Sequence, residues 1–114
     1  MRQWRTIVMV KFVETSVFTR RVTEMLPDDD YRLLQEALLQ RPARGSLIEG
    51  TGGIRKLRWG EEGRGKRGAL RVIYFWHVKL EMLLMLFLYR KSEQKDLSAQ
   101  QKRILAKIVR EEFK

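Results

Sequence analysis

Two segments that alternate in polarity flank a glycine-rich basic loop in the middle of the chain, and they constrain its fold more than any other feature. In chain order the three pieces are IRKLRW (54–59), GEEGRGKRG (60–68) and ALRVIYFW (69–76). Alternate side chains of a strand lie on opposite faces of a sheet, and glycine-rich loops join neighbouring strands. The pattern therefore predicts two paired strands, with Lys56, Arg58 and Arg71 converging on one face.

The remaining elements follow from capping signals and apolar spacing. A Thr15 or Ser16 cap begins a first helix, and Pro27 ends it. A second helix starts with three aspartates, which suit the positive end of a helix dipole, and closes at Pro42. Ser98 with Gln101 predicts a capping box for a last helix. The expected strands are 6–14 and 80–89, and the expected helices are 14–26, 27–42 and 96–113.

The order strand, helix, helix, three strands, helix predicts an α+β fold with a mainly antiparallel sheet. Two N-terminal helices are expected to cover one face, and a C-terminal helix completes the fold. A length of 114 residues favours one domain, residues 1–114. The most apolar stretch, 80–89, is shorter than the roughly 20 residues of a membrane helix and is expected to be a buried strand. No signal peptide is recognisable at the amino terminus.

The charge balance favours a polyanionic partner. The chain has 24 Lys and Arg against 14 Asp and Glu, a formal charge of +10, so RNA, DNA and an acidic protein are all open as partners. With no cysteine and a single histidine, His77, a thiolate or histidine metal site is not expected, nor is any cofactor. His77 is expected in a turn or in packing, and the absence of cysteine fits a reducing cytosol.

The convergent cations need an explanation as a group. A single exposed lysine or arginine is usually a solvated surface charge. Like charges that face each other across strands repel, however, and a bound phosphate chain would restore the lost stability. Glu61 and Glu62 in the loop are possible internal partners. Because the three cations are expected on a polar face, their replacement is expected to change stability little.

Three motifs together resemble the RelE superfamily of bacterial toxins, in particular its HigB branch. They are GTGGIRKLRW, GRGKRGALRVIYFW and LYRKSEQKDLS, and the helices before and after them also stand where that family has helices. The resemblance implies a small RelE-like α+β protein of the bacterial cytoplasm, an endoribonuclease that cuts messenger RNA in the ribosomal A site. Cleavage in the family needs no metal: the ribose 2′-hydroxyl attacks the adjacent phosphate and leaves a cyclic phosphate and a 5′-hydroxyl.

The resemblance also implies roles for individual cations. By position, the family's catalytic cations correspond to Lys56, Arg58, Arg71 and Lys91. Lys56 is the leading candidate for the base, because neighbouring cations favour the neutral form of a lysine. Arg58 and Arg71 would hold the scissile phosphate through paired hydrogen bonds. Lys91 would steady the leaving group, with Arg90 as the alternative.

Further contacts to RNA or the ribosome are expected outside this set. Arg64, Lys66 and Arg67 in the basic loop suit contacts to phosphates that do not depend on base sequence. Some RelE proteins have a tyrosine a few residues after the last cation, but that region is SEQKDLS here. Tyr89, which precedes it, is the alternative, although a tyrosine at a strand end usually packs. Arg90 completes the expected contacts.

Partners follow from the same resemblance. A HigA-like helix-turn-helix antitoxin is expected, and operator DNA would be bound only through it; the ribosome and messenger RNA are the targets, and no membrane is involved. The antitoxin could cover the cations with an acidic segment, or bind elsewhere and make the complex too bulky for the A site, which is the favoured route. The alternatives to an enzyme are a non-catalytic basic module that binds RNA or DNA and an inactive toxin-like partner of an antitoxin.

Overall fold

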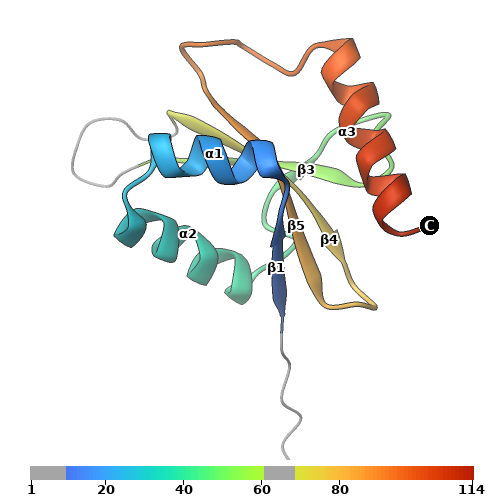
Figure 1. The fold of residues 1–114 in the computed structure, drawn as a ribbon, viewed down its shortest axis with the longest axis horizontal. Helices are drawn as coiled ribbons and strands as arrows, with labels where there is room; N and C mark the ends of the chain where they lie inside the picture. The colour runs from blue at the N-terminus through green and yellow to red at the C-terminus, as the bar shows by residue number, and fades with distance from the viewer. Residues whose placement is uncertain (1–9, 61–68) are drawn as a thin grey trace, which may run out of the picture.

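The computed structural model describes residues 10–60 and 69–114 (Figure 1). Three predictions fall outside the described residues. They are the start of the first strand, the internal partners Glu61 and Glu62, and the loop cations Arg64, Lys66 and Arg67.

A five-stranded mixed sheet forms the centre of the fold, in the order β1-β5-β4-β3-β2. Strand β1 is parallel to β5, and the other three neighbouring pairs are antiparallel. The predicted α+β class and mainly antiparallel sheet are therefore confirmed. The short β2 was not predicted. The strands are β1 (Lys11–Glu14), β2 (Ser46–Leu47), β3 (Ile54–Trp59), β4 (Leu70–His77) and β5 (Met82–Arg90).

Three helices begin close to the predicted caps: α1 (Ser16–Met25), α2 (Asp28–Gln40) and α3 (Ala99–Glu112). The Thr15 hydroxyl accepts a hydrogen bond from the backbone N–H of Phe18, which satisfies one of the free donors of the first turn of α1. The capping box of Ser98 and Gln101 is present at the start of α3, as predicted. Within the described residues, no helix is both long and apolar enough to cross a membrane.

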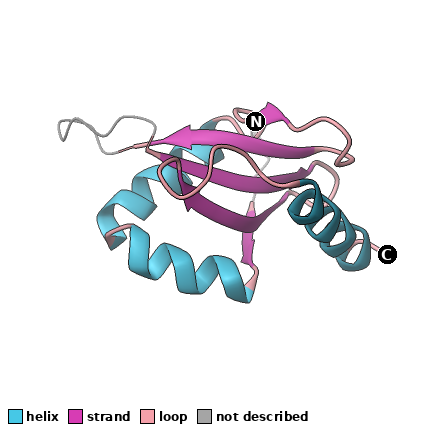
Figure 2. Ribbon diagram, turned by 90° about the horizontal axis from the view of Figure 1, so that it is seen from above, coloured by secondary structure: helices cyan, strands magenta, loops and turns pink. Residues whose placement is uncertain are grey.

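Apolar side chains form a separate core on each face of the sheet. Residues of α1 and α2, including Phe18 and Leu34, share one core with Leu57, Val72 and Met85 of the strands. Residues of α3 share the other core with Ile54, Ile73, Leu84 and Tyr89. Figure 1 shows α1 and α2 side by side and α3 apart from them, and Figure 2 shows the strands from above. The side-chain alternation predicted for β3 and β4 matches this division.

Helix α1 lies along the part of β5 that β1 does not reach. The pairing of β1 with β5 ends at Met85. Beyond it, the Thr15 hydroxyl donates to the carbonyl of Leu86 at 2.8 Å, and Arg21 Nε donates to the carbonyl of Leu88 at 2.6 Å. The Thr15 cap and Arg21 of α1 thus satisfy carbonyl groups that an open strand edge would otherwise present to other chains.

Candidate functional site

The register of β3, β4 and β5 brings the predicted cations together. Arg58 lies directly opposite Arg71, and Arg71 lies opposite Tyr89. Lys56 is two residues from Arg58 along β3, so it faces the same side. This is the side that carries α3, because Ile54 of β3 and Tyr89 of β5 belong to the core under that helix. The predicted convergence of Lys56, Arg58 and Arg71, which we call the cationic row, is confirmed.

The three cations differ in burial. Arg58 is exposed and Lys56 is half-buried, but Arg71 is only 7% exposed, and its guanidinium donates to the carbonyl of Leu70 at 3.3 Å. A buried charge is costly unless it is well partnered. The expectation that replacing these residues changes stability little assumed an exposed face, and the burial of Arg58 fits that assumption while the burial of Arg71 does not. The difference in burial arises because Arg71 is on the central strand β4, between β3 and β5, where even a charged side chain is covered.

An acidic residue that the sequence reasoning missed lies at the row. Asp96 Oδ1 is 3.3 Å from Lys56 Nζ, and both side chains are partly accessible. Asp96 belongs to the connection between β5 and α3, where its backbone carbonyl accepts a hydrogen bond from Gln94, which also bonds to Gln101. In the sequence, the segment SEQKDLS supplied part of a family motif and the Ser98 cap, and it lacked a tyrosine, but neither of its acidic residues was linked to the cations. Asp96, two positions before the Ser98 cap, was the feature of the sequence that could have indicated this carboxylate.

Tyr89 is packed into the core below the row. Its side chain is fully buried, and among the described residues its hydroxyl has no hydrogen-bond partner. Burial, followed by the negative charge of Asp96, raises the pKa of the Tyr89 phenol, while Arg71 acts in the opposite direction. The phenol therefore keeps its proton at neutral pH, which makes it a donor rather than a base. The usual role of a strand-end tyrosine, packing, is the one observed.

Arg90 and Lys91 are placed differently from the row. Arg90 is next to Tyr89 in β5, so its side chain is on the opposite face of the sheet, and its guanidinium lies 3.9 Å from Glu93. The backbone N–H of Arg90, and then Arg21, hydrogen-bond to Glu93 and lower the pKa of its carboxyl group. Lys91 is exposed just after β5, and its N–H donates to the carbonyl of Ala69 at 2.8 Å. Arg90 thus does not join the row, and Lys91 lies at the end of the strand ladder.

Other polar groups contribute little to this site. His77 is at the end of β4, where Nδ1 accepts a hydrogen bond from Leu80 N and the ring contacts Phe113 at 4.5 Å between centroids. The predicted turn and packing role of His77 is confirmed. Across residues 10–60 and 69–114, no three His, Cys, Asp or Glu side chains gather in a way that could hold a metal ion.

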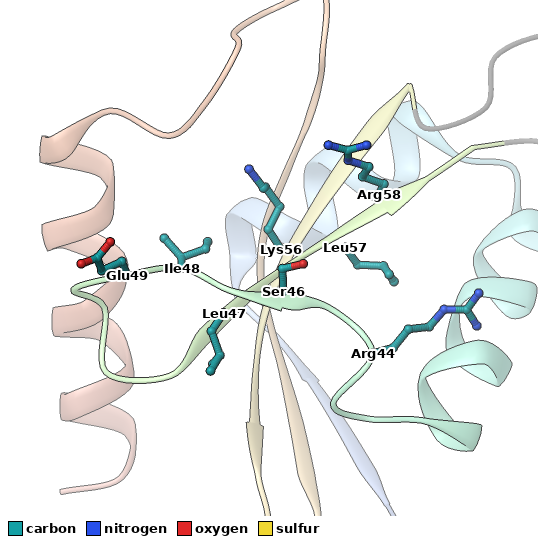
Figure 3. Close-up of a pocket in the computed structure, with 8 residues that line it drawn as sticks. All are labelled: Arg44, Ser46, Leu47, Ile48, Glu49, Lys56, Leu57 and Arg58. Atoms are coloured by element: carbon teal, nitrogen blue, oxygen red, sulfur yellow. The ribbon is translucent and has the colours of Figure 1, made fainter.

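A pocket of about 580 Å³ adjoins the row at the outer edge of β3 (Figure 3). Strand β2 pairs only with Arg55 and Lys56, so the remainder of β3 has no strand beside it on that side within the described residues. Ser46 is paired with Lys56 and therefore faces the same side of the sheet. The lining residues are Arg44, Ser46, Leu47, Ile48, Glu49, Lys56, Leu57 and Arg58.

Tyr89→Phe is expected to stabilise the protein slightly. The substitution removes a buried hydroxyl that has no partner among the described residues and keeps the packed ring. An unsatisfied buried polar group costs about 1–3 kcal/mol, so we expect the free energy of unfolding to rise by about 1 kcal/mol. Urea denaturation measures this change. A loss of stability would mean that the hydroxyl has a partner in the native protein.

No protein-family model matches the chain. Among solved structures, it is similar to a double arginine-to-alanine mutant of the E. coli toxin RelE in the free state. The TM-score is 0.53 at 11% sequence identity, and the match covers 75% of this chain and 87% of that chain. At this identity the similarity concerns the fold, and the protein has a RelE-like α+β fold.

Proposed function

We propose that this protein is a ribosome-dependent messenger-RNA endonuclease, the toxin of a type II toxin-antitoxin pair of the HigB branch. One observation carries the proposal: Arg58 and Arg71 lie directly opposite each other across β3 and β4, with Lys56 on the same face. Two guanidinium groups on one face can hydrogen-bond to the same anion, and hydrogen bonds between ionised groups are stronger than neutral ones. The RelE-like fold and the resemblance of the motifs support RNA as that anion.

The proposed reaction has three requirements. The attacking 2′-oxygen gives its proton to a base, the phosphorane needs positive charge around it, and the departing 5′-oxygen takes up a proton as its bond to phosphorus breaks. Arginine stays protonated and can bind two phosphate oxygens at once. Residues directly opposite in neighbouring antiparallel strands have Cα atoms about 5 Å apart. One phosphate can therefore bridge Arg58 and Arg71.

Lys56 and Asp96 are the two candidates for the base. The ion pair between them is partly accessible, so an RNA phosphate can compete with the Asp96 carboxylate for Lys56. Lys56 is our first choice, and in this scheme Lys91 steadies the leaving group. Tyr89 is not assigned as the base, because its side chain is fully buried and burial raises the pKa of its phenol.

Lys56→Arg tests this assignment. Arginine preserves the positive charge but cannot accept a proton, so we expect RNA affinity to be kept and cleavage to fall by about 10²-fold or more. Asp96→Asn, which removes only the carboxylate charge, is expected to keep cleavage. The assay uses end-labelled messenger RNA on programmed ribosomes, and it identifies the cyclic phosphate and the 5′-hydroxyl product ends.

Two outcomes would change the proposal. If Asp96→Asn loses cleavage and Lys56→Arg keeps it, Asp96 is the base. If the wild-type protein binds RNA and leaves it intact on ribosomes, the protein is the non-catalytic basic module or the inactive toxin-like partner of an antitoxin.

The proposal includes a protein partner and a second set of RNA contacts. The partner is a HigA-like helix-turn-helix antitoxin, and operator DNA is bound only through it. The test of the partner is whether coexpression of such a neighbouring protein restores growth. Arg64, Lys66 and Arg67 are proposed to contact ribosomal RNA phosphates, so affinity for ribosomes should fall as the salt concentration rises.

A further inference from the structure

The pocket at the outer edge of β3 continues the cationic row beyond the sheet. Lys56 and Arg58 belong both to the row and to the pocket wall. In Figure 3 these two side chains extend to one side of β3, while Leu57 and Arg44 lie on the other side. The pocket therefore curves around an edge that β2 leaves partly open. Ser46, which is paired with Lys56, adds a hydroxyl group to the lining of the pocket.

The path from Arg71 to the pocket is longer than a single phosphate. It crosses from β4 over β3 to the edge at β2, two strand spacings of about 4.8 Å each. Phosphates of one nucleic-acid strand recur about every 3.4 Å along a helix axis and are further apart in an extended strand. An RNA strand held at Arg58 and Arg71 can thus place its next nucleotide at the pocket, with Arg44 and Ser46 near its backbone.

One wall of the pocket has different chemistry. Glu49 is exposed and follows Ile48, which is half-buried against the core under α3. A carboxylate repels a phosphate, so the RNA backbone is expected to avoid this wall. A nucleobase has an apolar face that suits Ile48, and a base with an exocyclic amino group can donate a hydrogen bond to a carboxylate, as cytosine does through N4.

We infer that this pocket is a nucleotide subsite that selects a base carrying an exocyclic amino group, with Glu49 as the reader and Arg44 as a phosphate contact. The inference rests on the proposed function, because it takes the neighbouring cationic row to be an RNA site. It assigns base preference to Glu49, on the wall of a pocket that also contains Lys56 and Arg58, the residues proposed to act in cleavage.

The test measures binding of trinucleotides to the purified full chain. The probes are 2′-fluoro RNA, which has no 2′-hydroxyl to attack the phosphate, and they differ only by cytosine or uracil at one position at a time. We expect the wild-type protein to prefer cytosine at one position by at least about fivefold, the low end for a contact to a base edge. Glu49→Ala should remove this preference.

Two further variants control the test. Glu36→Ala removes the same charge from an exposed position on α2 and should keep the preference. Arg44→Ala should weaken binding of every probe to a similar extent, because a phosphate contact carries no base information. Equal binding of all probes by the wild-type protein, or a preference that survives Glu49→Ala, overturns the inference. If Arg58→Ala binds the probes as well as wild type does, the proposed RNA site itself is wrong.

Discussion

The double variant Lys56→Ala/Arg58→Ala is expected to lose the ability to arrest bacterial growth while remaining folded. Removing one group that stabilises developing charge in a transition state typically costs about 10²–10³-fold in rate, and this variant removes two neighbouring cations. We therefore expect RNA cleavage to fall by at least about 10³-fold. Growth after induced expression and cleavage of ribosome-bound messenger RNA are the two measurements.

The fold should tolerate this double change. Arg58 is exposed, and the partly accessible pair of Lys56 with Asp96 contributes about 1 kcal/mol or less. Thermal denaturation should therefore give a melting temperature close to that of wild type. A folded variant that still arrests growth as strongly as wild type would show that the proposed site is wrong.

Arg103→Ala/Lys107→Ala is the matched control, because it removes two positive charges from exposed positions on α3. It should remain toxic. Arg71→Ala is less informative than the double variant. Arg71 is buried, so a loss of toxicity in Arg71→Ala would not distinguish unfolding from loss of the site. Arg71→Lys retains the charge and gives up only the paired geometry of the guanidinium group.

Messenger RNA in a ribosomal A site is expected to be cut at least about 10³-fold faster than the same RNA free in solution. The described residues at the site provide cations and the Asp96 carboxylate, and none of them is assigned to fix the angle between the 2′-oxygen and the leaving oxygen. Correct orientation of reacting groups can supply about 7–11 kcal/mol of a reaction barrier. In this proposal the ribosome supplies much of that orientation.

The comparison requires the same RNA, enzyme concentration and salt concentration in both reactions, since phosphate contacts weaken as salt rises. Single-turnover cleavage rates separate the chemical step from binding. RNA of the same sequence on ribosomes with an occupied A site is the control and should be protected. Equal rates on free RNA and in an open A site would contradict ribosome dependence.

Local signals in the sequence were sufficient to predict much of the fold. The caps at Thr15 and Ser98 depend on residues three positions away, so sequence spacing reveals them. Alternation along β3 and β4 separated the cationic row from Leu57 and Val72, because a strand has a strict period of two. The two residues of β2 are too few to show any period, and that strand is defined only by its pairing with Arg55 and Lys56.

The details of the site that were missed depend on contacts distant in sequence. Asp96 reaches Lys56 from 40 positions away, and no local pattern links them. The burial of Arg71 depends on the strand order, which places β4 between β3 and β5. The sequence therefore predicted which cations share a face, but it did not predict how accessible each one is or which carboxylate lies beside them.

The position of β5 in the sheet determines when the sheet can be completed during synthesis of the protein. Strand β5 lies between β1 and β4, although it is the last of the described strands in the sequence, and Thr15 just before α1 bonds to Leu86, 71 positions later. Until β5 emerges from the ribosome, β1 with its helices has no strand to join it to β2, β3 and β4. Contacts between such distant residues also form slowly. A nascent chain therefore cannot complete the sheet that carries the cationic row until β5 has been translated, which separates the ribosome that makes the protein from the ones we propose it attacks.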